Sequence, residues 1–207
     1  MHRNITLHDV QFNWLTVLEP KRFKPDDPAR YQAEILIEDG SETAKMLEEA
    51  VFSAASEKWP GKEKGHVATA RANLKCAVKF GDKMPPDKNT GEIPEHYKGR
   101  VVVSSSRRLD RDGPLRCFSV RKSTGRLVEL TQDTNFDGDL VEPKRGCKGK
   151  AMISLWAWEH GGSPQINCTV ESLMFEDEGE PISANTALTV DAIAGAFGRE
   201  VEEEVTF

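Results

Sequence analysis

The chain has 207 residues, of which 38% are hydrophobic and 30% charged, and its formal net charge is −6 at pH 7. This apolar content suffices for one substantial core, and no stretch approaches the roughly 18 apolar residues of a membrane-spanning helix. The N-terminus also lacks the apolar run of a secretory signal, so we expect a soluble intracellular protein without membrane partners.

Charge is distributed unevenly along the chain. Residues 1–170 hold 27 Lys and Arg against 24 Asp and Glu, whereas residues 171–207 hold one basic residue, Arg199, against ten acidic residues. A mildly basic body with an acidic end is typical of a body that contacts nucleic acid and a tail that contacts a basic partner. The alternative is a tail that only promotes solubility.

The four cysteines, at positions 76, 117, 147 and 168, show neither a CxxC spacing nor a paired histidine motif. This pattern argues against a zinc site of the usual type and against a disulfide scaffold. We therefore expect buried free thiols.

The first predicted element is a long strand over residues 5–18, which carry many β-branched and aromatic residues, including Trp14. Its apolar residues lie on both faces, which predicts that both faces are covered. A proline-rich loop follows, with an aromatic ring among cations: Lys21, Arg22, Phe23 and Lys24. Such a loop can grip a nucleic-acid backbone and stack one base. The alternative is a solvated turn with Phe23 tucked inward.

A strand and a helix come next. Residues 31–38 alternate between apolar and polar, which predicts a strand that packs on the core. Residues 42–58 predict the best helix in the chain, because Ser41 or Asp39 can cap its start and Pro60 follows its end. The apolar residues of this helix recur at helical spacing and predict a stripe that faces the core.

The middle of the chain alternates between strands and loops. Residues 74–80 alternate and predict a strand, and residues 81–99 predict a long irregular loop because they are rich in turn residues. Residues 100–106 and 115–121 predict two further strands joined by a hairpin turn at Asp112–Gly113. Arginines crowd that turn, among them Arg107 and Arg108.

The stretch over residues 146–175 predicts a β-hairpin with two alternating arms around a polar turn. One face of the first arm is small and aliphatic, with Ala151, Ile153, Leu155 and Ala157. The opposite face and the segment just upstream carry aromatic and basic residues: Arg145, Lys148, Lys150, Trp156 and Trp158. Such a surface can stack bases and neutralise phosphates. The alternative is that both tryptophans cover a second hydrophobic layer or a neighbouring subunit.

Motifs of common enzymes are absent from the sequence, which has no Walker A loop, no Rossmann glycine pattern, no GxSxG and no HExxH. One acidic string resembles the start of a calcium loop, with Asp133, Asp137 and Asp139, but Lys144 stands where a bidentate glutamate is needed. We therefore expect no metal, no cofactor and no enzymatic activity. A magnesium-dependent nuclease that uses these aspartates is a distant alternative.

Together these elements predict a mainly β fold, namely an OB-like Greek-key barrel of five or six strands with one substantial helix at residues 42–58. We expect one domain over residues 1–182. Residues 183–207 are expected to form a linker, a short helix near residues 189–197 and a flexible acidic tail.

The order of these features resembles the single-stranded DNA-binding proteins of tailed bacteriophages. The resemblance rests on arrangement over residues 10–182: VLEPKRF (17–23), YQAEILI (31–37), a helix ending in Lys58–Trp59, RGCKGKAMISLWAW (145–158) and a final DEGEP segment (177–181). Members often show a phenylalanine before Glu-Pro, where this chain has VLEP. The loop at residues 81–99 also looks long for the family.

This resemblance implies a non-enzymatic protein that coats single-stranded DNA during phage replication or recombination in the host cytoplasm, and it allows a homodimer. Bases would stack on Trp156 and Trp158, helped by Trp14, Phe23 and Tyr97. Phosphates would contact Lys21, Arg22, Lys24, Arg107, Arg108, Arg145, Lys148 and Lys150. The rival hypothesis is a protein–protein adaptor that uses the exposed tryptophan face.

The end of the chain strengthens the resemblance. Single-stranded DNA-binding proteins commonly end in acidic residues followed by phenylalanine, and here Glu202, Glu203 and Glu204 precede Phe207. The resemblance implies that this tail docks on replication partners and competes with DNA for the basic groove.

Overall fold

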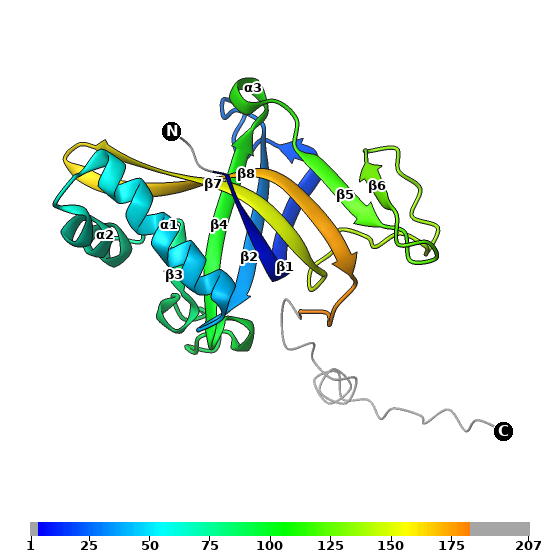
Figure 1. The fold of residues 1–207 in the computed structure, drawn as a ribbon, viewed down its shortest axis with the longest axis horizontal. Helices are drawn as coiled ribbons and strands as arrows, with labels where there is room; N and C mark the ends of the chain where they lie inside the picture. The colour runs from blue at the N-terminus through cyan, green and yellow to red at the C-terminus, as the bar shows by residue number, and fades with distance from the viewer. Residues whose placement is uncertain (1–3, 183–207) are drawn as a thin grey trace, which may run out of the picture.

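The computed structural model describes residues 4–182, in which one strongly curved sheet carries helices along one side (Figure 1). In chain order the elements are β1 (Asn4–Lys21), β2 (Arg30–Glu38), α1 (Glu42–Lys58), α2 (Glu63–Ala72), β3 (Val78–Phe80), η1 (Gly81–Lys83), η2 (Glu95–Tyr97), β4 (Arg100–Arg108), α3 (Leu109–Asp112), β5 (Arg116–Val120), β6 (Leu127–Leu130), β7 (Lys148–His160) and β8 (Ser163–Asp177). The short helix and acidic tail expected within residues 183–207 lie outside the described residues.

The sheet of the described residues has eight strands in the order β3-β4-β2-β1-β7-β8-β5-β6. The mainly β prediction is confirmed, but the predicted count of five or six strands is wrong. The observed count includes β3 and β6, which have three and four residues and pair at the two ends of the order. Of the strand predicted over residues 74–80, only Val78–Phe80 forms β3. Among the named strands, the pair β5–β8 is parallel, so β5 joins the sheet through a strand that follows it by more than 40 residues.

The segment that precedes β3 ties β4 to β8. Ser104 of β4 donates its backbone N–H to the carbonyl of Ala77 at 2.9 Å, and Ala77 donates its own to the carbonyl of Ile166 in β8 at 2.7 Å. Ile166 in turn donates to the carbonyl of Lys75 at 3.0 Å. Backbone hydrogen bonds through residues 75–77 therefore connect β4 with β8, which are not neighbours in the strand order.

The helix α1 forms at the predicted residues. Ser41 caps it, because its hydroxyl accepts a hydrogen bond from the N–H of Ala44 at 3.1 Å. Leu47, Val51 and Ala55 are fully buried and carry the predicted stripe into the core. Capping and helical spacing were sufficient signals, so this prediction is confirmed.

Two short helices differ from the predictions. The helix α2 was not predicted, because it contains Gly65 and buries only Val67 and Ala70, which is too short a stripe to recognise. The predicted hairpin at Asp112–Gly113 is wrong, since α3 occupies that turn and β4 and β5 are not paired with each other. Strand β5 pairs with β6 and β8 instead.

The core lies inside the curve of the sheet and under α1. Phe12 and Phe175 meet there with ring centroids 5.1 Å apart, and both side chains are fully buried. All four cysteines are buried free thiols, as expected. Burial raises the pKa of the Cys117 thiol to about 12 and that of Cys147 to about 11, which keeps both thiols neutral at physiological pH. Within residues 4–182 no helix is long and apolar enough to cross a membrane.

Candidate nucleic-acid interface

The β7–β8 hairpin is the longest paired element and forms where it was predicted (Figure 1). Its turn is the pair Gly161–Gly162, with φ angles of 55° and 75°. Two consecutive residues at positive φ are characteristic of a type I′ turn, which glycine adopts without strain. Ala151, Ile153 and Leu155 are buried on the inner face, so the predicted alternation of the first arm holds.

Trp156 and Trp158 lie together on the outer face of this hairpin. Their ring centroids are 6.0 Å apart, Trp156 is half-buried, and 37% of Trp158 is exposed. Each indole N–H donates to β8: that of Trp156 to Thr169 Oγ1 at 3.3 Å and that of Trp158 to Gln165 Oε1 at 3.2 Å. Both rings are thus held in position at the surface.

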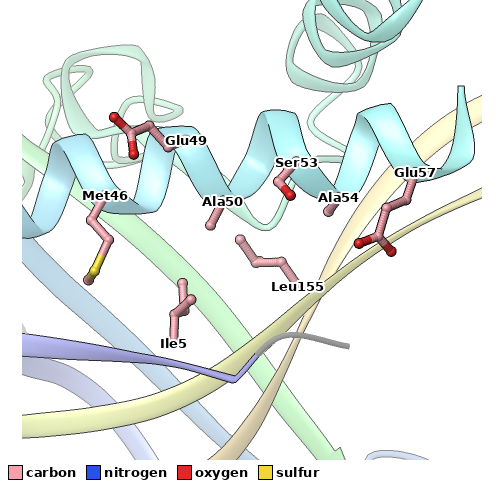
Figure 2. Close-up of a pocket in the computed structure, with 8 residues that line it drawn as sticks. All are labelled: Ile5, Met46, Glu49, Ala50, Ser53, Ala54, Glu57 and Leu155. Carbon is pink, nitrogen blue, oxygen red and sulfur yellow. The ribbon is translucent and has the colours of Figure 1, made fainter. Parts of the chain in front are cut away.

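The opposite face of β7 has a different chemistry. A groove of about 320 Å³ runs between α1 and the strands β1 and β7, with Leu155 in its floor (Figure 2). Its helix side carries Glu49 and Glu57. Because the carboxylate of Glu49 would repel phosphates, the groove is not a candidate for DNA, and the tryptophans face the other way.

The loop after β1 exposes all four of its predicted contact residues. Phe23 is 56% exposed, so the alternative in which its ring is tucked inward is wrong. Arg22 reaches only the carbonyl of Pro25, at 3.5 Å. Lys21 and Lys24 make no ion pair with any described residue, which leaves three cations and one ring free for a ligand.

The arginines at the end of β4 are already engaged. Arg107 pairs with Glu171 at 2.6 Å, with 15% and 26% of the two side chains exposed, and it also donates to the carbonyls of Asp112 and Gly113. Arg108 pairs with Asp110 at 2.6 Å. These two cations hold the turn together, so less of their charge is available to a ligand.

A second polar group gathers around Asn13, which is inserted as a bulge in β1 opposite β2. The buried Asn13 accepts from Arg145 Nε at 2.7 Å and donates to Glu34 Oε1 at 2.5 Å. Tyr97 also donates its hydroxyl to Glu34, at 2.9 Å. Burial, followed by the Glu34 charge, raises the pKa of Tyr97 to about 12, which keeps the phenol a donor.

Trp14 belongs to the same side of the sheet, because it pairs with Glu34 across β1 and β2. It is 59% exposed, so the expectation that both faces of the first strand are covered is wrong at this position. His96 completes the group, with its Nε2 3.5 Å from Arg145 Nη2. Burial and the Arg145 charge lower the pKa of His96, which favours the neutral ring as the acceptor.

The remaining predicted cations lie at the start of β7. Lys150 pairs with Glu176 at 2.9 Å, whereas Lys148 is exposed and makes no ion pair with any described residue. Apart from Arg107 and Arg108, the predicted contacts fall into three groups: the outer face of β7, the Asn13 group, and the loop at residues 21–24. Arg108 adjoins the loop, because it lines one pocket together with Arg22. Arg107 adjoins the first group, because Glu171 also accepts a hydrogen bond from Ser154 of β7 at 2.7 Å.

Sequence reasoning missed the supporting residues Asn13, Glu34 and His96. Their roles depend on a bulge and on a loop that folds back from residues 81–99, and neither has a local sequence signal. The aspartates Asp133, Asp137 and Asp139 form no metal-binding cluster. Within the described residues, no three His, Cys, Asp or Glu side chains lie together in a way that could hold a metal ion. Asp139 instead accepts from Arg121 and from Ser123, both at 2.8 Å.

Comparisons with known proteins connect this geometry to a family. Residues 3–205 match the family model described as Enterobacter phage Enc34, ssDNA-binding protein. Among solved structures, the chain is similar to the single-stranded DNA-binding protein of bacteriophage Enc34 in complex with ssDNA, with a TM-score of 0.63 and 17% identity over 87% of this chain and 89% of that one. No curated protein sequence matches the chain.

Two further structures are similar. The single-stranded DNA-binding protein of bacteriophage Enc34 in a second structure has a TM-score of 0.58 and 16% identity, over 93% of this chain and 89% of that one. The single-stranded DNA-binding protein gp2.5 of bacteriophage T7 has a TM-score of 0.44 and 12% identity, over 100% and 99% of the two chains. At these identities the Enc34 likeness establishes the fold alone.

Proposed function

The chain belongs to the family of phage Enc34 single-stranded DNA-binding proteins, and from this premise we propose that it binds single-stranded DNA without sequence preference. The observation that carries the proposal is the exposure of large aromatic rings on a charged surface: Trp14 at 59%, Phe23 at 56% and Trp158 at 37%. Rings left in water beside free cations suit a ligand that offers both stacking bases and phosphates.

Stacking and ion pairing divide the work among the three groups. We propose that bases stack on Trp156, Trp158, Trp14 and Phe23, with Tyr97 supporting the site through Glu34. Each stacked base contributes about 1–3 kcal/mol regardless of its identity. Phosphates would contact the cations that have no carboxylate partner within residues 4–182: Lys21, Arg22, Lys24, Arg145 and Lys148. Arg107, Arg108 and Lys150 would contribute less, because acidic side chains already neutralise them.

An OB-like arrangement is the architecture that best accounts for these contacts. Strand β1 pairs with both β2 and β7, β2 pairs with β4, and β7 pairs with β8. The link from β4 to β8 through Ala77 supports a barrel-like circuit of these five strands. The loop at residues 21–24 and the β7–β8 turn would then flank the binding surface.

The biological role we propose is to coat and protect single strands during phage replication or recombination, in the cytoplasm of the bacterial host and without catalysis. The binding domain would comprise residues 1–182, and residues 183–207 would serve as a linker and acidic tail. Glu202, Glu203, Glu204 and Phe207 would recruit replication proteins and compete with DNA. Deleting residues 199–207 should therefore tighten DNA binding at low salt.

Titration with oligo-dT tests the proposed function. Trp14, Trp156 and Trp158 would lie against bases, so we expect the intrinsic tryptophan fluorescence to be quenched on binding. A duplex of the same length should quench less, because paired bases hide their faces. Absence of quenching and of any mobility shift with oligo-dT would contradict the proposal and favour the adaptor hypothesis.

A further inference from the structure

The row of rings on the outer face of β7 does not end at Trp158. His160 lies two residues further along the strand, so its side chain points to the same face. Its ring centroid is 5.5 Å from that of Trp158, with 36° between the planes, and the residue is exposed. Three rings in a row therefore lead to the tip of the hairpin.

A cation reaches the same tip from another part of the chain. Lys75 donates from Nζ to Ser163 Oγ at 3.1 Å, and Ser163 is the residue paired with His160 across the hairpin. The backbone of Lys75 is held in place, because its carbonyl accepts from Ile166 of β8 at 3.0 Å. Lys75 is exposed and makes no ion pair with any described residue.

The tip is sterically open. A Cβ atom at Gly161 or Gly162 would meet no atom within 4 Å, so none of residues 4–182 covers the turn. The neighbouring carboxylate, Glu159, belongs to the opposite face of the strand by alternation. A single strand passing Trp158 would thus meet an exposed ring and an exposed lysine beside an open turn.

We propose that His160 and Lys75 form an additional nucleotide-binding subsite at the hairpin tip, in which the base stacks on the imidazole and a phosphate contacts the ammonium group. The subsite rests on the proposed function and extends it by one nucleotide beyond Trp158. Successive rings are 6.0 and 5.5 Å apart, more than the rise of about 3.4 Å between stacked bases. Bases on consecutive rings must therefore be splayed, which a single strand permits and a duplex does not.

Substitution of His160 tests the stacking contact. The variant His160→Ala should bind oligo-dT at least about fivefold more weakly, whereas His160→Phe, which keeps a ring, should stay within about twofold of the parent. His8→Ala is the matched control, because His8 is an exposed histidine of β1 that lies beside residues 149–151 of β7, at the other end of that strand from His160. Circular dichroism melting curves should be the same for all three variants.

Substitution of Lys75 tests the phosphate contact. The slope of log affinity against log salt should become shallower by about 0.7 in Lys75→Ala. It should not change in Lys64→Ala, which removes an exposed lysine from α2. This readout distinguishes a lost phosphate contact from a small loss of stability at the tip.

The variant Trp158→Ala distinguishes failure of the subsite from failure of the proposed DNA-binding function. If Trp158→Ala weakens binding while His160→Ala and Lys75→Ala both bind like the parent, the subsite is overturned and the proposed function stands. If Trp158→Ala and the variants of the loop at residues 21–24 also have no effect, the proposed DNA surface fails together with the subsite. Equal losses in His160→Ala and His160→Phe would overturn the stacking role.

Discussion

The loop at residues 21–24 and the turn at residues 107–112 have similar basic sequences but opposite electrostatic states. In the turn, Arg107, Arg108 and Arg111 each pair with a carboxylate, at distances of 2.6 to 2.7 Å. In the loop, Lys21 and Lys24 have no such partner among the described residues, although Asp26 and Asp27 follow closely in sequence.

The difference arises from backbone geometry. The helical turn α3 folds Asp110 and Asp112 back toward the arginines that precede them. In the loop, Pro25 separates the cations from the aspartates, and the chain turns through a hydrogen bond from Asp27 N–H to the Lys24 carbonyl. A count of charges along a sequence therefore does not reveal which charges are free to bind a ligand.

The largest expected difference between the turn at residues 107–112 and the loop at residues 21–24 is in protein stability. Replacing Arg107 with Ala leaves Glu171 half-buried without its partner, and we expect the free energy of unfolding to fall by about 3 kcal/mol. Replacing the exposed Arg22 with Ala should change it by less than about 0.5 kcal/mol. Urea denaturation followed by circular dichroism measures both values. Similar losses in the two variants would contradict the distinction.

The ring in the loop should matter for DNA and not for folding. We expect Phe23→Ala to lose about 1–3 kcal/mol of oligo-dT binding free energy, because one stacked base is lost. Leu127→Ala, which changes an exposed leucine on β6, is the control and should bind normally. Fluorescence anisotropy with labelled oligo-dT gives the affinities, and a Phe23→Ala variant with parental affinity would remove the ring from the site.

Cations of the loop and of the turn should differ in how much they contribute to the salt dependence of DNA binding. The double variant Lys21→Ala/Lys24→Ala removes two free charges, so the slope of log affinity against log salt should become shallower by about 1.4. The variant Arg108→Ala should change the slope by less than about 0.7, because Asp110 already neutralises this arginine. An equal or larger change in Arg108→Ala would reverse the assignment of free and engaged cations.

The smallest expected effect is on the acid titration of the two aspartates in the turn, Asp110 and Asp112. Hydrogen bonds from Arg111 and Arg108 lower the pKa values of Asp112 and Asp110 below the ordinary aspartate range. The stabilisation from these lowered pKa values is present above the ordinary pKa of about 4 and is lost as the pH falls through the folded-state values. NMR titration of the carboxylates should show both midpoints below that range. A midpoint at the ordinary value for Asp112 would contradict the pairing.

Much of the fold was predictable because its signals are local. Alternation located the hairpin arms, and a cap with a proline stop located α1. The parallel pairing of β5 with β8 could not be inferred, since it joins residues more than 50 positions apart and leaves no periodic trace. The ion pair between Arg107 and Glu171 could not be predicted for the same reason, because its two residues lie far apart in the sequence.

The sequence indicated which residue types could form the candidate site. It did not indicate how the fold places them relative to one another. Exposure of Trp158 and Phe23 agrees with the surface expected from the sequence. Arg145 was identified as a cation, but its fixed position depends on Asn13, which becomes available only through a bulge in β1. Bulges and long loops are set by tertiary packing, so a single sequence does not indicate them.

Photo-crosslinking tests most directly whether single-stranded DNA lies on the exposed aromatic rings. Oligo-dT carrying 5-iodouracil would be irradiated with the full-length protein, and the crosslinked residues would be identified by mass spectrometry. We predict crosslinks to Phe23, Trp14 and the tryptophans of β7, and none to the α1 groove around Glu49. Crosslinks confined to that groove or to α3, with none on the exposed rings, would contradict the account.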